Sequence, residues 1–170
     1  MRFITKTLRT MMALLTLGFL SATSVNAQLL TESFENGGSV PANWAAEAVT
    51  GTAGTLPFVT SSTYPTVAAA ANGTYFVKFN SFSANSSNSN RLKMTIGFST
   101  VDFQDVGVNF SWDEDPGYAS SADKVTVQWS ADGATWTSAG DFLRYNAAAG
   151  WKDKSVTLPA GANDQPNLYL

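Results

Sequence analysis

Residues 106–112 read Val-Gly-Val-Asn-Phe-Ser-Trp, and every second side chain in this stretch is apolar. Because successive side chains of a β-strand point to opposite faces, the four apolar residues would share one face of a sheet. The four are Val106, Val108, Phe110 and Trp112. The residues between them are small or polar, as in antiparallel sheets with one face in water. The stretch therefore predicts a β-strand with one buried face.

The same alternation recurs along the chain, and no segment shows a sustained helical period. The stretches that follow it are 75–79, 92–98, 125–129 and 155–158. In residues 92–98 the expected buried face consists of Leu92, Met94, Ile96 and Phe98. In residues 125–129 it consists of Val125, Val127 and Trp129. Many short strands of this kind predict an all-β fold, an antiparallel β-sandwich of the jelly-roll type.

Turn-forming sequences separate these stretches. They are Asn36-Gly37-Gly38, Asn72-Gly73, Asp115-Pro116-Gly117 and Asp132-Gly133. The last one predicts a hairpin between residues 125–130 and 134–137, in which Asp132 caps the turn and Gly133 takes a positive φ. Residues 45–74 and 80–90 are predicted to be surface loops, with a short strand expected at 56–60.

The composition excludes several kinds of chemistry. The 170-residue chain has no histidine and no cysteine, so it cannot form a Ser-His-Asp triad, a His metal site, a disulfide or a thiolate zinc site. Carboxylates and hydroxyls are left for chemistry, which favours binding over catalysis. The length fits one domain with a real core.

Residues 1–27 have a basic start, an apolar run and a small-residue end at Ala27, which predicts a secretory signal peptide. The apolar run of about 11 residues is shorter than the roughly 20 that span a bilayer. Its removal leaves a single domain, 28–170, with 7 basic and 13 acidic residues and a net charge of −6. Nucleic-acid binding is not expected of such a chain. We expect a secreted or cell-surface protein with no membrane insertion after signal cleavage.

Two acidic groups are candidates for a calcium site, because calcium prefers six to eight oxygen ligands from flexible loops. Glu32 and Glu35 form one group. Asp113, Glu114 and Asp115 form the other, with Asp123 nearby. Asp113 and Asp115 are favoured as metal ligands by the local density of charge. The alternative is a solvated acidic loop.

Four aromatic residues lie beside Gly or Pro turns rather than within alternating strands. They are Trp44, Tyr118, Tyr145 and Trp151. Because flat rings stack on the apolar faces of sugars, these four are candidate ligand-binding residues. The alternative for each is packing in the core or at its rim.

Glycoside hydrolysis is the enzymatic alternative, since it requires two carboxylates and no histidine. The neighbouring acids of each group are too close in sequence to face each other across a bond without another element. We therefore expect no catalytic residues.

Several segments of the chain together resemble a known family of domains. Residues 32–44, Glu-Ser-Phe-Glu-Asn-Gly-Gly-Ser-Val-Pro-Ala-Asn-Trp, resemble the opening of the MAM-like, cleaved-adhesin or choice-of-anchor type domains of exported Bacteroidetes proteins. Segments 115–118, 123–128, 130–136, 142–145 and 150–151 follow in the family's order. The resemblance covers residues 29–170 and implies a jelly-roll sandwich, an adhesion or ligand-binding role, and calcium bound through Glu35. The family continues through two further strands, so the resemblance also implies a domain truncated at its C-terminus.

Together these observations predict an exported, non-catalytic adhesion or ligand-binding module. Its expected partner is a glycan or an extracellular protein, with calcium as a structural aid. The alternatives are a spacer domain of a larger surface protein and a glycosidase or lyase.

Overall fold

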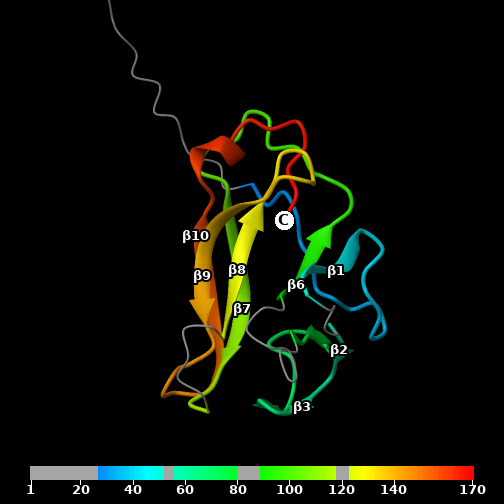
Figure 1. Ribbon diagram of the computed structural model, residues 1–170, viewed down its shortest axis with the longest axis vertical. Helices are drawn as coiled ribbons and strands as arrows, with labels where there is room; N and C mark the ends of the chain where they lie inside the picture. The colour runs from blue at the N-terminus through cyan, green and yellow to red at the C-terminus, as the bar shows by residue number, and fades with distance from the viewer. Residues whose placement is uncertain (1–26, 52–55, 80–88, 118–122) are drawn as a thin grey trace, which may run out of the picture.

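The computed structural model describes residues 27–51, 56–79, 89–117 and 123–170, which form ten strands and one short 3₁₀ turn, η1 (Figure 1). In chain order the elements are β1 (Trp44–Thr50), β2 (Phe58–Val59), β3 (Ser62–Thr63), β4 (Thr66–Val67), β5 (Phe76–Val77), β6 (Ser89–Met94), β7 (Gly107–Glu114), β8 (Lys124–Trp129), β9 (Thr137–Leu143), β10 (Gly150–Thr157) and η1 (Ala160–Ala162). The all-β prediction is confirmed for these residues. In the same part of the chain, no helix is long and apolar enough to cross a membrane.

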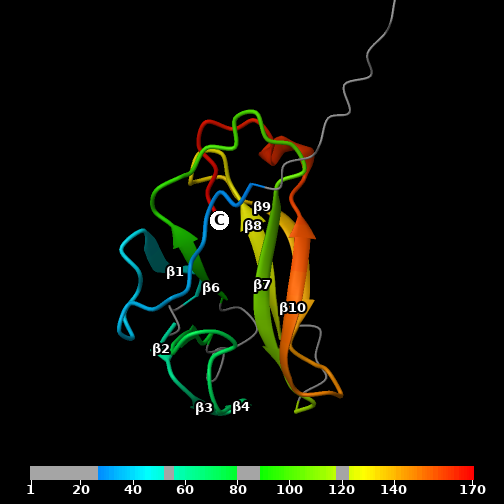
Figure 2. The same ribbon diagram turned by 180° about the vertical axis from the view of Figure 1, so that it is seen from behind.

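The strands associate as antiparallel pairs: β1 with β6, β2 with β5, β3 with β4, β7 with β10, and β8 with β9. The β7–β10 pair is regular over its whole length, from Glu114 opposite Gly150 to Gly107 opposite Thr157. Figure 2 shows this pair in front of the β8–β9 hairpin when the molecule is seen from behind. The ring centroids of Phe110 in β7 and Phe142 in β9 lie 4.9 Å apart, so the two pairs pack against each other.

The C-terminal residues 167–170 connect two of these pairs. The backbone N–H of Leu168 donates to the Phe98 carbonyl at 2.7 Å, and Phe98 donates back at 3.0 Å. On the other side, Tyr169 and Ser130 exchange two hydrogen bonds of 2.9 and 3.0 Å. The C-terminus accordingly lies between β6 and β8 in Figure 1. This segment therefore acts as a short bridging strand between the chain that follows β6 and the end of β8.

The main core lies beneath this bridging strand. Its buried members are Val106, Leu158, Ala162 and Leu168, and the last two have no exposed surface. Half-buried apolar side chains from β7, β8 and β9 pack around them, including Val108, Val127 and Ala139. The predicted buried faces of residues 106–112 and 125–129 are consistent with this packing. Apolar burial of this kind is the main favourable term in folding.

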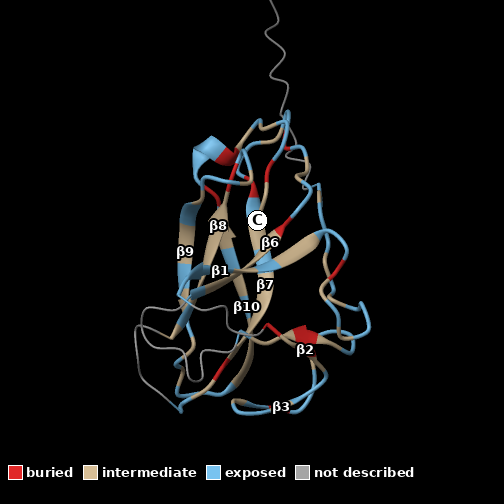
Figure 3. Ribbon diagram, turned by 45° about the vertical axis from the view of Figure 1, so that its right-hand side comes forward, coloured by how far each residue is buried: buried red, intermediate tan, exposed pale blue. Residues whose placement is uncertain are grey.

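A second buried group lies around β2 and β5, where Figure 3 shows β2 in the colour of buried residues. Phe58 and Phe76 are its largest buried side chains. The Phe58 ring lies 5.7 Å from Phe34, and the Phe76 ring meets Trp151 of β10 edge-on at 5.5 Å. Aromatic contacts thus attach the β2–β5 region to the N-terminal segment on one side and to β10 on the other.

The prediction that residues 45–74 form a surface loop is wrong for the described residues, although the short strand expected at 56–60 is present as β2. The segment contains β1 and three short strands, and Val67 is 5% exposed. Its many Ala and Thr side chains obscure the alternation by which a strand is recognised, because Ala and Thr are not strongly apolar. Of the other predicted loop, residues 80–88 lie outside the described residues, and Ser89 and Asn90 belong to β6.

Two predicted faces are also corrected. Ile96 is 60% exposed, because β6 ends at Met94 and the chain turns outward before it pairs with the bridging strand. In residues 75–79 the buried side chain is Phe76, which stacks on Trp151, whereas Phe79 is exposed. Packing against an aromatic partner distant in sequence decides which face is buried here.

The predicted hairpin at Asp132-Gly133 is confirmed, since β8 and β9 pair across it, but its second strand begins at Thr137 rather than at residue 134. The Asp132 carboxylate accepts hydrogen bonds from the backbone N–H groups of Ala134 and Thr135 at 2.8 and 2.7 Å, and Gly133 has a φ of +70°. These bonds, with those from Ser130 and the Thr135 hydroxyl, lower the pKa of Asp132 far below its usual value. Asp132 is a turn cap, as predicted.

Candidate functional site

The β8–β9 hairpin carries a shallow, open hollow of about 400 Å³. It is lined by Lys124, Thr126 and Gln128 from β8 and by Ser138, Ala139, Gly140 and Asp141 from β9. The polar β8 residues alternate with Val125, Val127 and Trp129, two of which pack against the main core. The side chains of Lys124, Thr126 and Gln128 therefore lie on the face of β8 that points away from that core. We call this set of seven residues the hairpin hollow.

The polar groups of the hairpin hollow hold one another in place. Asp141 accepts hydrogen bonds from the Lys124 ammonium at 2.5 Å and from the Thr126 hydroxyl at 2.6 Å. The hydrogen bond from Lys124, followed by that from Thr126, lowers the pKa of Asp141. Asp141 is consequently ionised at neutral pH. The hollow offers ammonium, hydroxyl, amide and carboxylate groups beside the small side chains of Ser138, Ala139 and Gly140.

A second cluster of charges adjoins the hollow at Gln128. Arg91 of β6 donates from Nε to the Gln128 side chain at 3.1 Å and from Nη1 to Glu47 of β1 at 2.9 Å. Lys93 contacts the other oxygen of Glu47 at 2.5 Å. The hydrogen bond from Lys93 is the main reason that the pKa of Glu47 is lowered, and Arg91 adds to it. We call Glu47, Arg91 and Lys93 the basic corner.

The predicted acidic group, Asp113 to Asp115, lies at the end of β7. Tyr145 forms a bridge beside Asp115, and Trp151 pairs with Asp113 across the β7–β10 ladder. Four predicted site residues thus lie at one end of the molecule, namely Asp113, Asp115, Tyr145 and Trp151. We call this end the acidic end. Glu35 and Trp44 belong to other elements, and Tyr118 lies outside the described residues.

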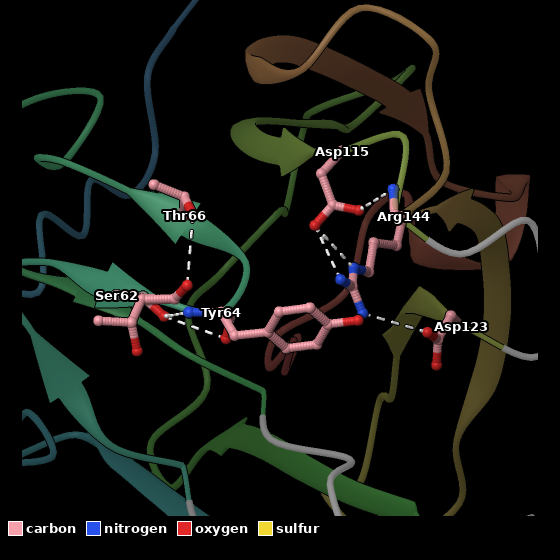
Figure 4. Close-up of polar contacts among 8 residues, drawn as sticks. Ser62, Tyr64, Thr66, Asp115, Asp123 and Arg144 are labelled. Carbon is pink, nitrogen blue, oxygen red and sulfur yellow. Dashed lines mark hydrogen bonds and ion pairs between the residues drawn. The ribbon is translucent and has the colours of Figure 1, made fainter.

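Arg144 organises the acidic end, as Figure 4 shows. Its guanidinium donates to one oxygen of Asp115 from Nη2 at 2.7 Å and from Nε at 3.2 Å, and it reaches Asp123 at 3.3 Å. The same guanidinium lies 5.0 Å from the ring centroid of Tyr64. Tyr64 stands at the tip of the β3–β4 hairpin and is 60% exposed. The Arg144 charge is therefore shared between two carboxylates and one aromatic face.

The three consecutive acids at the end of β7 have different environments. Glu114 is buried, and its carboxylate binds the Lys154 ammonium at 2.5 Å and the Asn146 amide at 2.6 Å. Burial pulls the Glu114 pKa upward, but hydrogen bonds from Lys154 and Asn146 outweigh it and leave the pKa lowered. The pKa of Asp113 is instead raised, first by burial and then by repulsion from Asp115 and Glu114.

Two regions of the described chain thus present groups that suit a ligand, the hairpin hollow with its basic corner and the acidic end. No family model, curated protein or solved structure matches this chain.

The candidate calcium ligands are largely engaged within the protein. One oxygen of Glu35 accepts the backbone N–H groups of Thr74 and Tyr75 at 2.7 and 2.9 Å, bonds that lower its pKa, with the Tyr75 bond as the larger cause. Asp115 is occupied by Arg144 and by the Gly117 N–H. Within the described ranges, no three acidic side chains converge as a metal site. Calcium binding, which needs six to eight oxygen ligands, stays a prediction.

The position of Glu35 predicts that replacing Gly73 will destabilise the protein. Gly73 has a φ of +74°. A Cβ atom on Gly73 would overlap Glu35 Oε1, so alanine there must displace the carboxylate that holds residues 74–75. Gly37 is the matched control, because its φ is +62° and a Cβ atom added there would have no atom of the described chain within 4 Å.

We expect Gly37→Ala to cost the roughly 1–2 kcal/mol of a left-handed alanine, and Gly73→Ala to cost clearly more. Urea unfolding of both variants measures the difference. Equal free energies of unfolding for the two variants would show that the Glu35 carboxylate contributes little to the stability of residues 73–75.

The predicted aromatic ligand residues have different roles. The Trp44 indole donates to Glu32 at 3.0 Å, and the Trp151 indole donates to the Ala69 carbonyl at 2.9 Å. Both rings also stack on phenylalanines, so these two tryptophans fasten distant segments together. Tyr145 differs from them, because 43% of its surface is exposed at the acidic end.

The sequence interpretation missed the hairpin hollow, the basic corner and Tyr64. The positions of the hollow residues were predictable in part, because Lys124, Thr126 and Gln128 occupy the polar face of a predicted strand. The hydrogen-bonded partners of the basic corner are 37 and 44 positions apart in the chain, and no local pattern joins them. For Tyr64, the proline that follows it was the available signal for an exposed turn.

Proposed function

We propose that this chain is an exported, non-catalytic module that binds carbohydrate through the hairpin hollow. The observation that carries the proposal is the composition of that hollow. The hollow is lined by hydroxyl, amide, ammonium and carboxylate groups of Thr126, Gln128, Lys124 and Asp141, together with small residues of β9. A sugar chain presents closely spaced hydroxyl groups that both donate and accept hydrogen bonds, and this mixture of partners complements it.

The shape of the hollow favours an extended ligand over an enclosed small molecule. Its volume of about 400 Å³ is comparable to that of small ligand sites, but it is open along the face of a hairpin. Ser138, which is exposed, leaves this space clear because its side chain is short. A polysaccharide can cross such a surface without having to enter a cavity.

The carboxylates favour binding rather than hydrolysis. In the described part of the chain the hollow is lined by one carboxylate, Asp141, which Lys124 and Thr126 keep ionised. Glycoside hydrolysis generally uses two carboxyl groups about 5–10 Å apart on opposite sides of the bond, one of them protonated. A single ionised, hydrogen-bonded carboxylate is better suited to orienting a sugar hydroxyl.

We further propose that the strand pairs form the two layers of a jelly-roll β-sandwich. The contact between Phe110 and Phe142 and the bridging strand at 167–170 support this arrangement. The resemblance of residues 32–44 to the opening of cleaved-adhesin type domains supports an extracellular binding role. The basic and apolar character of residues 1–27 supports export.

The proposal is tested by filling the hollow. Ser138 is exposed on β9, and we expect Ser138→Tyr to weaken polysaccharide binding at least tenfold, or about 1.4 kcal/mol, with little change in melting temperature. Affinity electrophoresis against β-glucan, xylan, mannan, galactan and polygalacturonate measures the effect. Ser155→Tyr places the same ring on an exposed position of β10 and should bind as the wild type does. Retention of full affinity by Ser138→Tyr would contradict the proposal.

A further inference from the structure

We infer that the hairpin hollow and the basic corner together bind an acidic polysaccharide, whose uronate carboxylates pair with Arg91 and Lys93. This inference rests on the proposed function, because it takes the hollow to be a carbohydrate site. It adds the chemical class of the sugar and a second group of contacts.

The hollow and the corner are continuous. Gln128 lines the hollow, and its side-chain oxygen accepts the 3.1 Å hydrogen bond from Arg91 Nε. Glu47 and Lys93 follow on the adjoining β1–β6 pair, where Glu47 lies opposite Arg91 in the strand register. A chain that lies along the hollow therefore meets the corner where β8 approaches β6.

The corner carries an excess of positive charge. Arg91 and Lys93 converge on the single carboxylate of Glu47, which leaves one net positive charge. At the far side of the hollow, by contrast, Lys124 and Asp141 balance each other. The whole chain has a net charge of −3, yet three of the seven basic residues after residue 27 lie on this surface. A carboxylate on the ligand would neutralise the positive charge of Arg91 and Lys93 that Glu47 does not neutralise.

The cations at the corner are held in a position to accept an anion. Their side chains are 17% and 25% exposed, so a bound carboxylate would be screened less by water than at an open surface. The Arg91 guanidinium lies 4.6 Å from the Trp136 ring centroid, which fixes its plane. Its Nη2 has no hydrogen-bond partner among the described residues. Arg91 can therefore keep its present contacts and still donate to a carboxylate.

A single excess charge suits separate carboxylates rather than a nucleic acid. Binding to a phosphate backbone depends on several cations that each neutralise a phosphate. The corner supplies one net charge, and the adjoining hollow supplies neutral hydrogen-bonding groups. A sugar chain that carries carboxylates among hydroxyl groups matches both parts of this surface.

The first test compares polygalacturonate with the same polymer after chemical reduction of its carboxyl groups. We expect this chain to bind polygalacturonate at least tenfold more tightly than the reduced polymer, as measured by isothermal titration calorimetry. Equal affinity for the two polymers would overturn the uronate inference and leave carbohydrate binding intact. No affinity for either polymer or for the neutral panel would overturn both. Equally tight binding of polyglutamate would also overturn the inference, because that polymer carries carboxylates without sugars.

The second test uses two substitutions with opposite expected effects. Lys93→Gln removes the excess charge and should weaken polygalacturonate binding about three- to tenfold, whereas Glu47→Gln should strengthen it by a similar factor. Both effects should shrink between about 0.05 M and about 0.5 M salt. Lys152→Gln, on β10, makes the same change in net charge elsewhere and is the control. Equal affinities for the Lys93 and Glu47 variants would overturn the role of the corner.

Discussion

Replacing Leu168 with alanine should lower the free energy of unfolding by about 3–5 kcal/mol, the largest effect that we expect from a single substitution in this chain. Leu168 has no exposed surface and packs with Val106, Leu158 and Ala162. The shorter side chain would remove buried apolar surface and leave a cavity, and both changes are unfavourable. For a domain of this size the melting temperature should fall by roughly 10 °C.

Leu143→Ala is the matched control for Leu168→Ala. The Leu143 side chain is 45% exposed, and the contact that it makes with the Trp112 indole uses the backbone carbonyl, which alanine retains. We expect a change within about 0.5 kcal/mol. Thermal unfolding followed by circular dichroism compares the two variants. Similar shifts in both would mean that Leu168 does not occupy the core.

Lys154→Met should cost about 3 kcal/mol or more at neutral pH, because it leaves the buried Glu114 carboxylate without its cation. Glu114 is 4% exposed, and Asn146 would remain as its hydrogen-bond partner. The double variant Glu114→Gln/Lys154→Met removes both charges and should recover most of the loss. Lys124→Met, which breaks the more exposed pair with Asp141, should cost no more than about 1 kcal/mol.

The effect of Lys154→Met should depend on pH. Because Lys154 and Asn146 lower the folded-state pKa of Glu114, the pair stabilises the fold above the usual glutamate value of 4.5. This contribution is lost as the pH falls through the lowered pKa. Urea unfolding at about pH 7 and about pH 3 should therefore show a large difference between wild type and variant at the first value and a small one at the second. An equal difference at both would exclude an ionic role for the pair.

The sequence predicted the elements whose buried face is strongly apolar. The alternation at residues 106–112 and the turn at Asp132-Gly133 both correspond to observed structure, because local pattern and tertiary packing agree there. Strand β1 was missed, since its residues Trp-Ala-Ala-Glu-Ala-Val-Thr show no clear alternation of apolar and polar residues. Propensity and pattern are weak where small side chains leave the choice to tertiary contacts.

The sequence predicted the types of residue in the candidate site but not where the site lies on the fold. The sequence pointed to the acidic end of β7 and to exposed aromatics, and the structure does bring Asp115 and Tyr145 together there. The hairpin hollow depends on the register in which β8 and β9 pair and on the small residues of β9. The basic corner depends on how β6 approaches β8 through the bridging strand. Neither arrangement is encoded within a short stretch of sequence.

The bridging strand also has a consequence for the order of folding. The β8–β9 hairpin joins neighbouring parts of the chain, so it can form early with a small loss of chain entropy. Leu168 instead pairs with Phe98, 70 positions earlier, and its neighbour Tyr169 pairs with Ser130. The pairing of residues 167–170 with both Phe98 and Ser130 can therefore form only after these residues have been synthesised. Because long-range pairing of this kind slows folding, we expect this contact to form late.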